Sequence, residues 1–192
     1  MKDTLIKIEE EVAACQACQL CKTRTNTVPG YGSSQADVMF IGEAPGKNED
    51  LQGKPFIGAA GKVLDGLLAS INLKREDVFI ANVVKCRPPL NRDPLPEEVA
   101  ACADFLQRQV TLIRPKIIIL LGRHAMDRFI PGLKISLDHG KPKRKDGNVY
   151  FPIYHPAATI YNRALIEELQ KDFKKIPKII DMIEKEKDQL RG

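Results

Sequence analysis

Four short apolar runs constrain the fold of this chain more than any other feature. They are residues 38–41, 78–84, 117–121 and 149–153, and each is followed by a loop and then by a segment of helical character. Apolar residues occupy almost every position of these runs, as expected for strands that are covered on both faces. The alternation predicts an α/β fold, a three-layer sandwich in which these four strands form a central, mostly parallel sheet flanked by helices.

The whole chain, residues 1–192, is expected to form a single domain, because no repeat or linker divides it. Its net charge of +5 permits a polyanionic partner without requiring one. No apolar run approaches the roughly 20 residues that span a bilayer, and the first four residues carry no signal-peptide pattern. We therefore expect a cytoplasmic protein that acts as a monomer and has no membrane partner. Helices are expected over residues 4–14, 60–71, 96–113, 123–129 and 163–185.

A glycine-rich loop, residues 42–61, joins the first expected strand to the helix that follows it. Glycine accepts unusual backbone angles and lets a ligand approach the main chain closely, and a loop of this length is usually functional. Its chemically useful side chains are Glu43, Glu49, Asp50 and Phe56. The combination favours a ligand site over a plain surface loop.

Polar residues stand where the other strands are expected to end. In a parallel α/β sheet, ligands bind outside the carboxyl ends of the strands. Glu43, Asn82 with Lys85, Gly122 and His155 all fall at such ends, so we expect them to converge on one crevice. Residues 141–145, K-P-K-R-K, are most simply a solvated basic loop that could also meet phosphates. His124 and His139 belong to no motif and receive no role.

Three of these residues suit recognition of a flat heterocycle. The amide of Asn82 offers a donor and an acceptor side by side, which matches the edge of uracil and mismatches cytosine. His155 could donate a hydrogen bond to a developing oxyanion, and the ring of Phe56 could stack on a base. Each also has a simpler explanation: a structural hydrogen bond for Asn82, a satisfied loop histidine for His155, and core packing for Phe56.

The five cysteines indicate metal or redox chemistry rather than disulfides, because no secretion signal accompanies them. Cys15 and Cys18 have chelating spacing, and Cys86 and Cys102 form a second, wider pair. Four thiolates suit either tetrahedral zinc or a [4Fe–4S] cluster, and spacing alone slightly favours zinc as the commoner structural metal. Cys21 also has chelating spacing from Cys18, while Cys102 could simply be a small buried residue.

Taken together, the motifs resemble family 4 uracil-DNA glycosylases, the iron–sulfur-containing branch of that superfamily. The matching segments occur in the same order and cover residue 15 to about 165. They are G-E-A-P-G at 42–46, E-D at 49–50, G-K-P-F-I-G at 53–58, N-V-V-K-C-R-P at 82–88, H-P-A-A at 155–158 and the four paired cysteines.

The resemblance implies a DNA-repair enzyme that flips deoxyuridine out of single- or double-stranded DNA and hydrolyses its N-glycosidic bond. Its uracil pocket would be formed by Gly42, Glu43 and Ala44, with Phe56 stacking on the base, Asn82 reading its edge, His155 at O2 and Glu49 excluding a thymine methyl group. The segment after His155, through about Tyr161, would enter the DNA helix in place of the extruded base.

The resemblance also implies that Cys15, Cys18, Cys86 and Cys102 hold a [4Fe–4S] cluster rather than zinc, which would staple the N-terminal segment to the sheet. Cys21 is then expected not to be a ligand. The best-known branch of the superfamily has an Asp where this chain has Ala44, so Glu43 becomes the candidate for activating water.

Other functions are compatible with parts of the sequence. A non-catalytic iron–sulfur or zinc module of a repair or replication assembly would explain the cysteines, and a related glycosylase could accept a wider range of deaminated bases. A phosphate-binding α/β protein is disfavoured because the glycine-rich loop matches neither nucleotide-binding pattern. The pocket motifs contain no evident lysine nucleophile, which predicts excision without strand cleavage, although Lys85 lies close in sequence.

Overall fold

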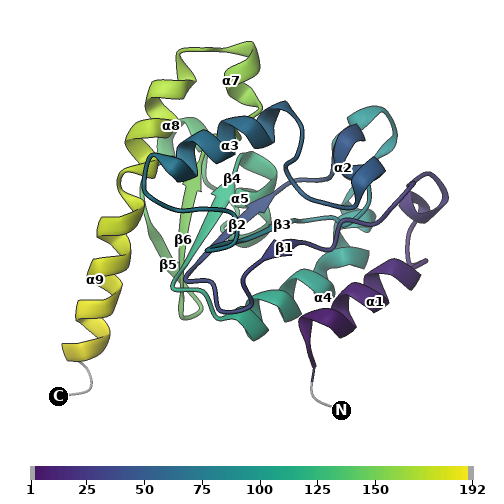
Figure 1. The fold of residues 1–192 in the computed structure, drawn as a ribbon, viewed down its shortest axis with the longest axis horizontal. Helices are drawn as coiled ribbons and strands as arrows, with labels where there is room; N and C mark the ends of the chain where they lie inside the picture. Colours follow the sequence, from purple (N-terminus) through teal and green to yellow (C-terminus); the bar gives the residue numbers. More distant parts are fainter. Residues whose placement is uncertain (1–2, 190–192) are drawn as a thin grey trace.

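Six strands form one mixed sheet in the computed structural model, which describes residues 3–189 (Figure 1). Residues 1–2 and 190–192 of the predicted domain lie outside the described residues. The strand order is β1-β3-β2-β4-β6-β5. The strands are β1 Tyr31–Gly32, β2 Val38–Gly42, β3 Phe79–Asn82, β4 Ile117–Leu121, β5 Lys143–Lys145 and β6 Asn148–Ile153.

The four inner strands are parallel and correspond to the four predicted runs, so the α/β class and the parallel core of the sheet are confirmed. The sheet is larger than the four predicted strands, because β1 and β5 add an antiparallel strand at each edge. Strand β1 has only two residues, too few to show a pattern. Strand β5 was expected to be a basic loop, yet Asp146-Gly147 forms a tight turn with positive φ angles, which is a recognised hairpin signal.

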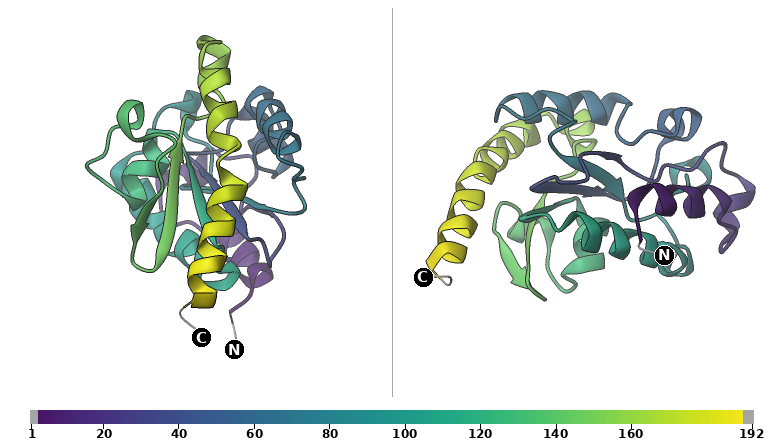
Figure 2. Two further views of the ribbon diagram at one scale, coloured as in Figure 1. Left: turned by 90° about the vertical axis from the view of Figure 1, so that its left-hand side faces the viewer. Right: turned by 60° about the horizontal axis from the view of Figure 1, so that its bottom comes forward.

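The helices cover both faces of the sheet, as the two further views show (Figure 2). On one face, side chains of α3, α8 and α9 pack against Phe40, Ile80 and Ile119. On the other face, side chains of α4 and α5 pack against Met39 and Ile118. Neighbouring residues of a strand point to opposite faces, so apolar runs are needed to bury both faces of the sheet.

The helices differ from expectation in several places, including the short helix α6 Ile135–Asp138 in a stretch expected to be polar loop. The glycine-rich loop contains a helix of its own, α2. The expected C-terminal helix is two helices, with Pro177 in the first turn of the second, a favourable position for proline. A short helix, α7, follows His155. The helices are α1 Leu5–Ala14, α2 Lys47–Gln52, α3 Ala59–Ala69, α4 Pro96–Ile113, α5 Arg123–Phe129, α6 Ile135–Asp138, α7 Ala158–Tyr161, α8 Leu165–Phe173 and α9 Ile176–Gln189, with 3-10 turns at Gln19–Lys22 and Pro89–Asn91.

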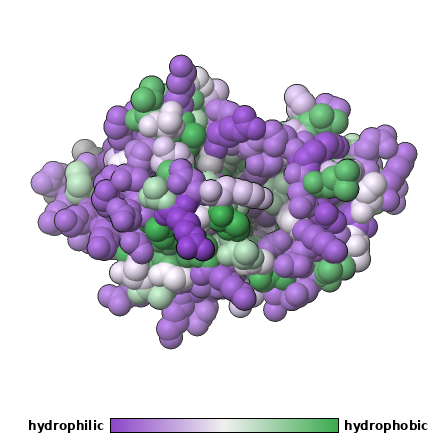
Figure 3. Space-filling model, turned by 90° about the horizontal axis from the view of Figure 1, so that it is seen from above, coloured by the Kyte–Doolittle hydropathy of each residue, from purple (hydrophilic) through white to green (hydrophobic). Residues whose placement is uncertain are grey.

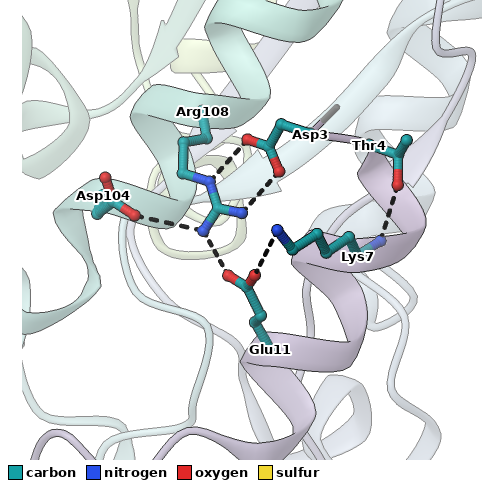
Figure 4. A network of polar contacts seen from close by, with 6 residues as sticks. All are labelled: Asp3, Thr4, Lys7, Glu11, Asp104 and Arg108. Carbon is teal, nitrogen blue, oxygen red and sulfur yellow. Dashed lines mark hydrogen bonds and ion pairs between the residues drawn. The ribbon is translucent and has the colours of Figure 1, made fainter. Parts of the chain in front are cut away.

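Helix α1 is fastened to α4 by a polar network around Arg108 (Figure 4). The Arg108 guanidinium donates two hydrogen bonds to Asp3, at 2.7 and 2.8 Å, and pairs with Glu11 of α1 and Asp104 of α4. The network brings the end of α1, where Cys15 follows, towards the helix that carries Cys102. No helix within residues 3–189 combines the length and apolar character needed to cross a membrane.

Candidate active site

A cavity of about 270 Å³ opens at the carboxyl edge of the inner strands. The ends of β2, β3 and β6 each contribute to its wall, as expected for a ligand site in a parallel α/β sheet. Six of the seven predicted pocket residues line it: Glu43, Ala44, Glu49, Phe56, Asn82 and His155. Lys85 and Gly122, expected at the same edge, do not line it.

Gly42, the seventh predicted residue, allows two of the others to approach each other. A Cβ atom at this position would lie 2.4 Å from the Asn82 side-chain oxygen and 2.7 Å from the Phe56 ring. Both distances are shorter than real contacts. A glycine is therefore required here for close packing, and not for an unusual φ angle.

The amide of Asn82 is the most informative group in the pocket. Asn82 is only 2% exposed, and its Oδ1 is a buried side-chain acceptor without a hydrogen-bond partner in the described part of the chain. A buried polar atom without a partner is costly, and such atoms are rare in native proteins. An unpartnered acceptor in the wall of a cavity points to a ligand that supplies the donor.

His155 is held in one protonation state and one tautomer. Enclosure in the pocket lowers its pKa to about 4, with a smaller contribution from the nearby His124, so the ring is neutral at physiological pH. The backbone N–H of Ala157 donates to Nδ1 at 3.1 Å. The single ring proton therefore lies on Nε2, which makes that nitrogen a hydrogen-bond donor.

Phe56 forms one wall of the pocket, and its backbone is strained. Its ring centroid lies 5.4 Å from that of His155. Its φ angle is 54°, a left-handed value that is unfavourable for a residue with a side chain. Arg75 holds this segment: its guanidinium donates to the carbonyl oxygens of Pro55 and Phe56, while its Nε donates to Asp65. Gly61 lets α3 pass close to the Phe56 carbonyl group, because a Cβ atom at residue 61 would overlap that carbonyl.

Glu49 folds the glycine-rich loop back on itself. One of its carboxylate oxygens accepts hydrogen bonds from the backbone N–H groups of Ile57 and Gly58, both at 2.9 Å. Because Glu49 also lines the cavity, the same carboxylate stabilises the loop and shapes the pocket. Asp50, buried beside it, accepts a hydrogen bond from the N–H of Thr25 and thereby ties α2 to the N-terminal segment.

Glu43 belongs to a small polar cluster that the sequence did not reveal. Burial raises the pKa of Glu43, and the nearby His124 opposes that rise. The Nε2 atom of His124 lies 3.4 Å from Glu43 and 3.3 Å from Asp93, and Arg123 donates to Asp93. His124 is therefore a neighbour of the site, although no motif contains it.

The cysteines surround a second cavity, on the α1 and α4 side of the sheet. All five line it, together with Arg24 and Lys85. Arg24 donates a hydrogen bond to the Cys86 sulfur at 3.2 Å, and the backbone N–H of Lys85 donates to the Cys102 sulfur at 3.3 Å. Burial raises the pKa of Cys102 to about 11, so a metal centre must displace the thiol proton.

The spacing of these sulfurs bears on which metal they could hold. A single zinc ion bound at about 2.3 Å needs sulfurs roughly 3.8 Å apart. Within residues 3–189, no three cysteine sulfurs lie within 4.8 Å of one another. The set is thus wider than a mononuclear zinc site requires.

Known proteins match most of the length of this chain. The family model for the uracil DNA glycosylase superfamily matches residues 29–180. The chain is 51% identical over 185 residues to the type-4 uracil-DNA glycosylase of Archaeoglobus fulgidus, covering 91% of this chain and 92% of that protein. It is 50% identical to the type-4 uracil-DNA glycosylase of Saccharolobus solfataricus (91% of this chain, 85% of that protein) and 42% identical to that of Thermotoga maritima (85% and 90%).

The chain belongs to the type-4 uracil-DNA glycosylase family. Membership confirms the resemblance seen in the sequence motifs and agrees with the α/β fold. In this member of the family, Ala44 contributes only a methyl group to the pocket wall, and Glu43 is the carboxylate at the end of β2.

Sequence reasoning missed three features around the glycosylase pocket. Arg75 comes from the turn before β3 and looks like an ordinary exposed basic residue. His124 is brought to Glu43 by the first turn of α5. The pocket wall also includes Pro88, Asn91 and Arg92 from the segment after β3. Only this last group had a signal, because Pro88 ends the matched motif N-V-V-K-C-R-P and Asn91 and Arg92 follow soon after it.

Proposed function

We propose that this protein removes uracil from DNA by hydrolysing the N-glycosidic bond of an extruded deoxyuridine, leaving an abasic site. The observation that carries the proposal is the unpartnered, buried Oδ1 of Asn82 in the pocket wall. Uracil N3–H is a donor that would satisfy it, while the Asn82 amide N–H groups would meet O4. Cytosine presents the opposite pattern at both positions and would leave the acceptor unpaired.

The pocket walls favour a flat pyrimidine that has left the base stack. The Phe56 ring offers a stacking face, and Glu49 stands on the pocket wall as the candidate group that excludes a methyl group at C5. A flipped base leaves the stack at a cost of a few kcal/mol, which is smallest where the base is mispaired. Uracil opposite guanine is therefore the expected preferred duplex substrate.

His155 supplies the stabilisation of the leaving group. As the N-glycosidic bond breaks, its electron pair stays with the base and negative charge develops on uracil O2. The neutral His155 ring donates its Nε2–H to that oxygen, and the N–H of Ala157 keeps this tautomer in place. One such oriented donor is typically worth about 3–4 kcal/mol in the transition state.

Glu43 is the carboxylate available to position the attacking water and to stabilise the cation-like sugar. Its raised pKa leaves a smaller ionised fraction at mildly acidic pH. We therefore expect excision to decline on the acidic side as Glu43 becomes protonated. His124 lies within contact of this carboxylate and helps to keep it ionised.

The donor set of the cysteine cavity suits a [4Fe–4S] cluster held by Cys15, Cys18, Cys86 and Cys102. The wide sulfur spacing supports this choice over zinc, while the cations Arg24 and Lys85 that line the cavity would favour either anionic centre. When bound, the cluster supplies structural cross-linking between α1, the loop after β3 and α4, with all four iron-binding positions filled by protein. Cys21 remains a non-ligand in this proposal.

The placement of Lys85 argues for excision without strand cleavage. Lys85 is 1% exposed, and its ammonium group donates to the Asn82 backbone oxygen at 3.0 Å and to Gln109 at 2.7 Å. It lines the cysteine cavity and not the uracil pocket, so it is placed to support Asn82 from behind and not to attack a sugar.

The deciding experiment is an excision assay on oligonucleotides that contain a single uracil or a single cytosine, with abasic sites detected by alkaline cleavage. Wild-type protein should release uracil only. Asn82→Asp loses the donor to O4, so uracil excision should fall about 100-fold and cytosine excision should become measurable.

The matched control is Asn148→Asp, at the amino end of β6 on the opposite edge of the sheet. It should leave both rates unchanged. Absence of uracil release by wild-type protein would overturn the proposed function. Unaltered rates in Asn82→Asp would show instead that this amide is structural.

A further inference from the structure

Leu90 is an exposed apolar side chain whose placement neither the core nor the pocket chemistry explains. It is 94% exposed, so it contributes almost nothing to the core. Its backbone has φ 55° and ψ 20°, and the next residue, Asn91, has φ 56°. Two consecutive left-handed residues with side chains are unfavourable, and glycine would relieve the strain at either position.

The segment is also braced, so Leu90 is presented on a rigid tip. Pro88 and Pro89 restrict the chain before it, and Arg87 donates to the Asn91 side chain at 2.7 Å. On the far side, Arg92 makes a two-point ion pair with Glu98 at 2.6 and 2.9 Å, and Glu98 is itself only 1% exposed. The fold therefore fixes an exposed leucine where a flexible polar loop would have sufficed.

This tip lies at the rim of the uracil pocket. Pro88, Asn91 and Arg92, all within two residues of Leu90, line that pocket. The segment after His155 reaches the same pocket through Ala157 and carries another exposed apolar tip, with Tyr161 92% and Ile160 52% exposed. The face seen in Figure 3 is mainly hydrophilic, with apolar groups in small separate patches. Two different segments thus bring apolar tips to the rim of one base-sized pocket.

We propose that Leu90 is a second insertion residue, which enters the base stack of duplex DNA beside the extruded nucleotide while the α7 segment fills the vacated position. Apolar side chains wedged between base steps are an established way to stabilise unstacked DNA. Arg87, three residues earlier in the chain, is placed to meet the phosphates that flank such a step. The inference rests on the proposed function and concerns duplex substrates alone, because single-stranded DNA has no partner strand to hold apart.

The test compares single-turnover uracil excision from a single strand, a U·G duplex and a U·A duplex. For Leu90→Ala we expect about a tenfold loss on U·A, a smaller loss on U·G and a change of less than about twofold on single strands. Leu90→Met, which restores a long apolar side chain, should recover most of the duplex rate. Met182→Ala is the matched control, because Met182 is 60% exposed and lies on α9, which contributes no residue to the pocket wall.

Leu90→Gly separates the wedge from folding. It removes the side chain and also relieves the left-handed strain, so its melting temperature should equal or exceed that of the wild type while duplex excision falls as in Leu90→Ala. Equal losses on single and double strands, or an unchanged duplex rate, would overturn the wedge. Failure of wild-type protein to release uracil from a single strand would instead overturn the proposed function, so the two failures are distinguishable.

Discussion

The uracil pocket and the cysteine cavity share a segment of chain but are assembled in different ways. Asn82 lines the pocket, and three residues later Lys85 and Cys86 line the cysteine cavity. The pocket is built at strand ends that the parallel sheet brings together in any case. The cysteine cavity needs α1 and the following turn to dock against α4, a contact that no strand enforces. The comparison suggests that the pocket residues perform the reaction, while the cysteines stabilise the fold.

Removing the leaving-group donor should have the largest effect on chemistry and a small effect on folding. His155→Ala should lower single-turnover excision by about 10²–10³-fold, because one oriented donor to the developing charge is lost. Affinity for DNA with a stable abasic-site analogue should change little, since no base occupies the pocket there.

Excision assays and fluorescence binding titrations measure the two quantities. Unchanged excision in His155→Ala would remove this residue from the mechanism. An equal loss of excision and of analogue binding would indicate damage to the DNA-binding surface instead.

Removing a cysteine ligand should have a large effect on folding and a small effect on the chemistry of the protein that remains folded. Cys86→Ser should lose iron and the visible absorbance of an iron–sulfur protein, and its melting temperature should fall by roughly 10 °C as the cross-link between α1, the loop after β3 and α4 is lost. The fraction that remains folded should still prefer uracil over cytosine.

Cys21→Ser is the matched control, because Cys21 lines the same cavity and is not a proposed ligand. It should retain iron and melting temperature. A colourless wild-type preparation with one zinc per chain would contradict the cluster, and loss of iron from Cys21→Ser would change the ligand set.

Acidification should lower the free energy of unfolding because His155 resists protonation in the folded protein. Its pKa is about 4 in the folded protein and about 6.5 when unfolded, so the unfolded chain binds the proton more readily between these values. The contribution of the neutral His155 ring to the free energy of unfolding is complete above pH 6.5 and is lost as pH falls towards 4. The loss should be roughly 2–3 kcal/mol, since the ring is partly exposed to the pocket.

Chemical denaturation at several pH values measures this contribution as the difference between wild type and His155→Gln, which does not titrate. A difference that is independent of pH between 4 and 7 would show that His155 keeps an ordinary pKa.

Arg75 sharpens the comparison, because it stabilises the pocket without touching the base. Arg75→Ala releases the carbonyl oxygens of Pro55 and Phe56 and should lower excision about tenfold by letting Phe56 relax from its left-handed backbone. Iron content should be unchanged. Arg75→Lys keeps the charge but not the two-point contact, so it should recover only part of the rate in the same assay.

Lys62→Ala, on the neighbouring helix α3, is a control for loss of a basic residue from this region. An excision rate in Arg75→Ala equal to that of Lys62→Ala would show that the Phe56 segment holds its shape unaided.

Much of the fold was predictable because the signals are local. Apolar runs long enough for buried strands identified β2, β3, β4 and β6, and the segments of helical character that follow the strands identified α3, α4 and α5, while apolar periodicity identified α1. The edge strands escaped for different reasons, since β1 has two residues and β5 is entirely basic. The break between α8 and α9 was also missed, although Pro177 marked it.

The sequence by itself determined which residue types are available and which strand ends carry them: Asn82, His155, Glu43 and the paired cysteines. It determined this because strand position and motif order are properties of the chain. Only the tertiary structure decided the tautomer of His155, the missing partner of Asn82, the pairing of His124 with Glu43, the clamp of Arg75 on Phe56 and the exposure of Leu90. These depend on distances between atoms far apart in the chain, which burial and packing set and no local pattern records.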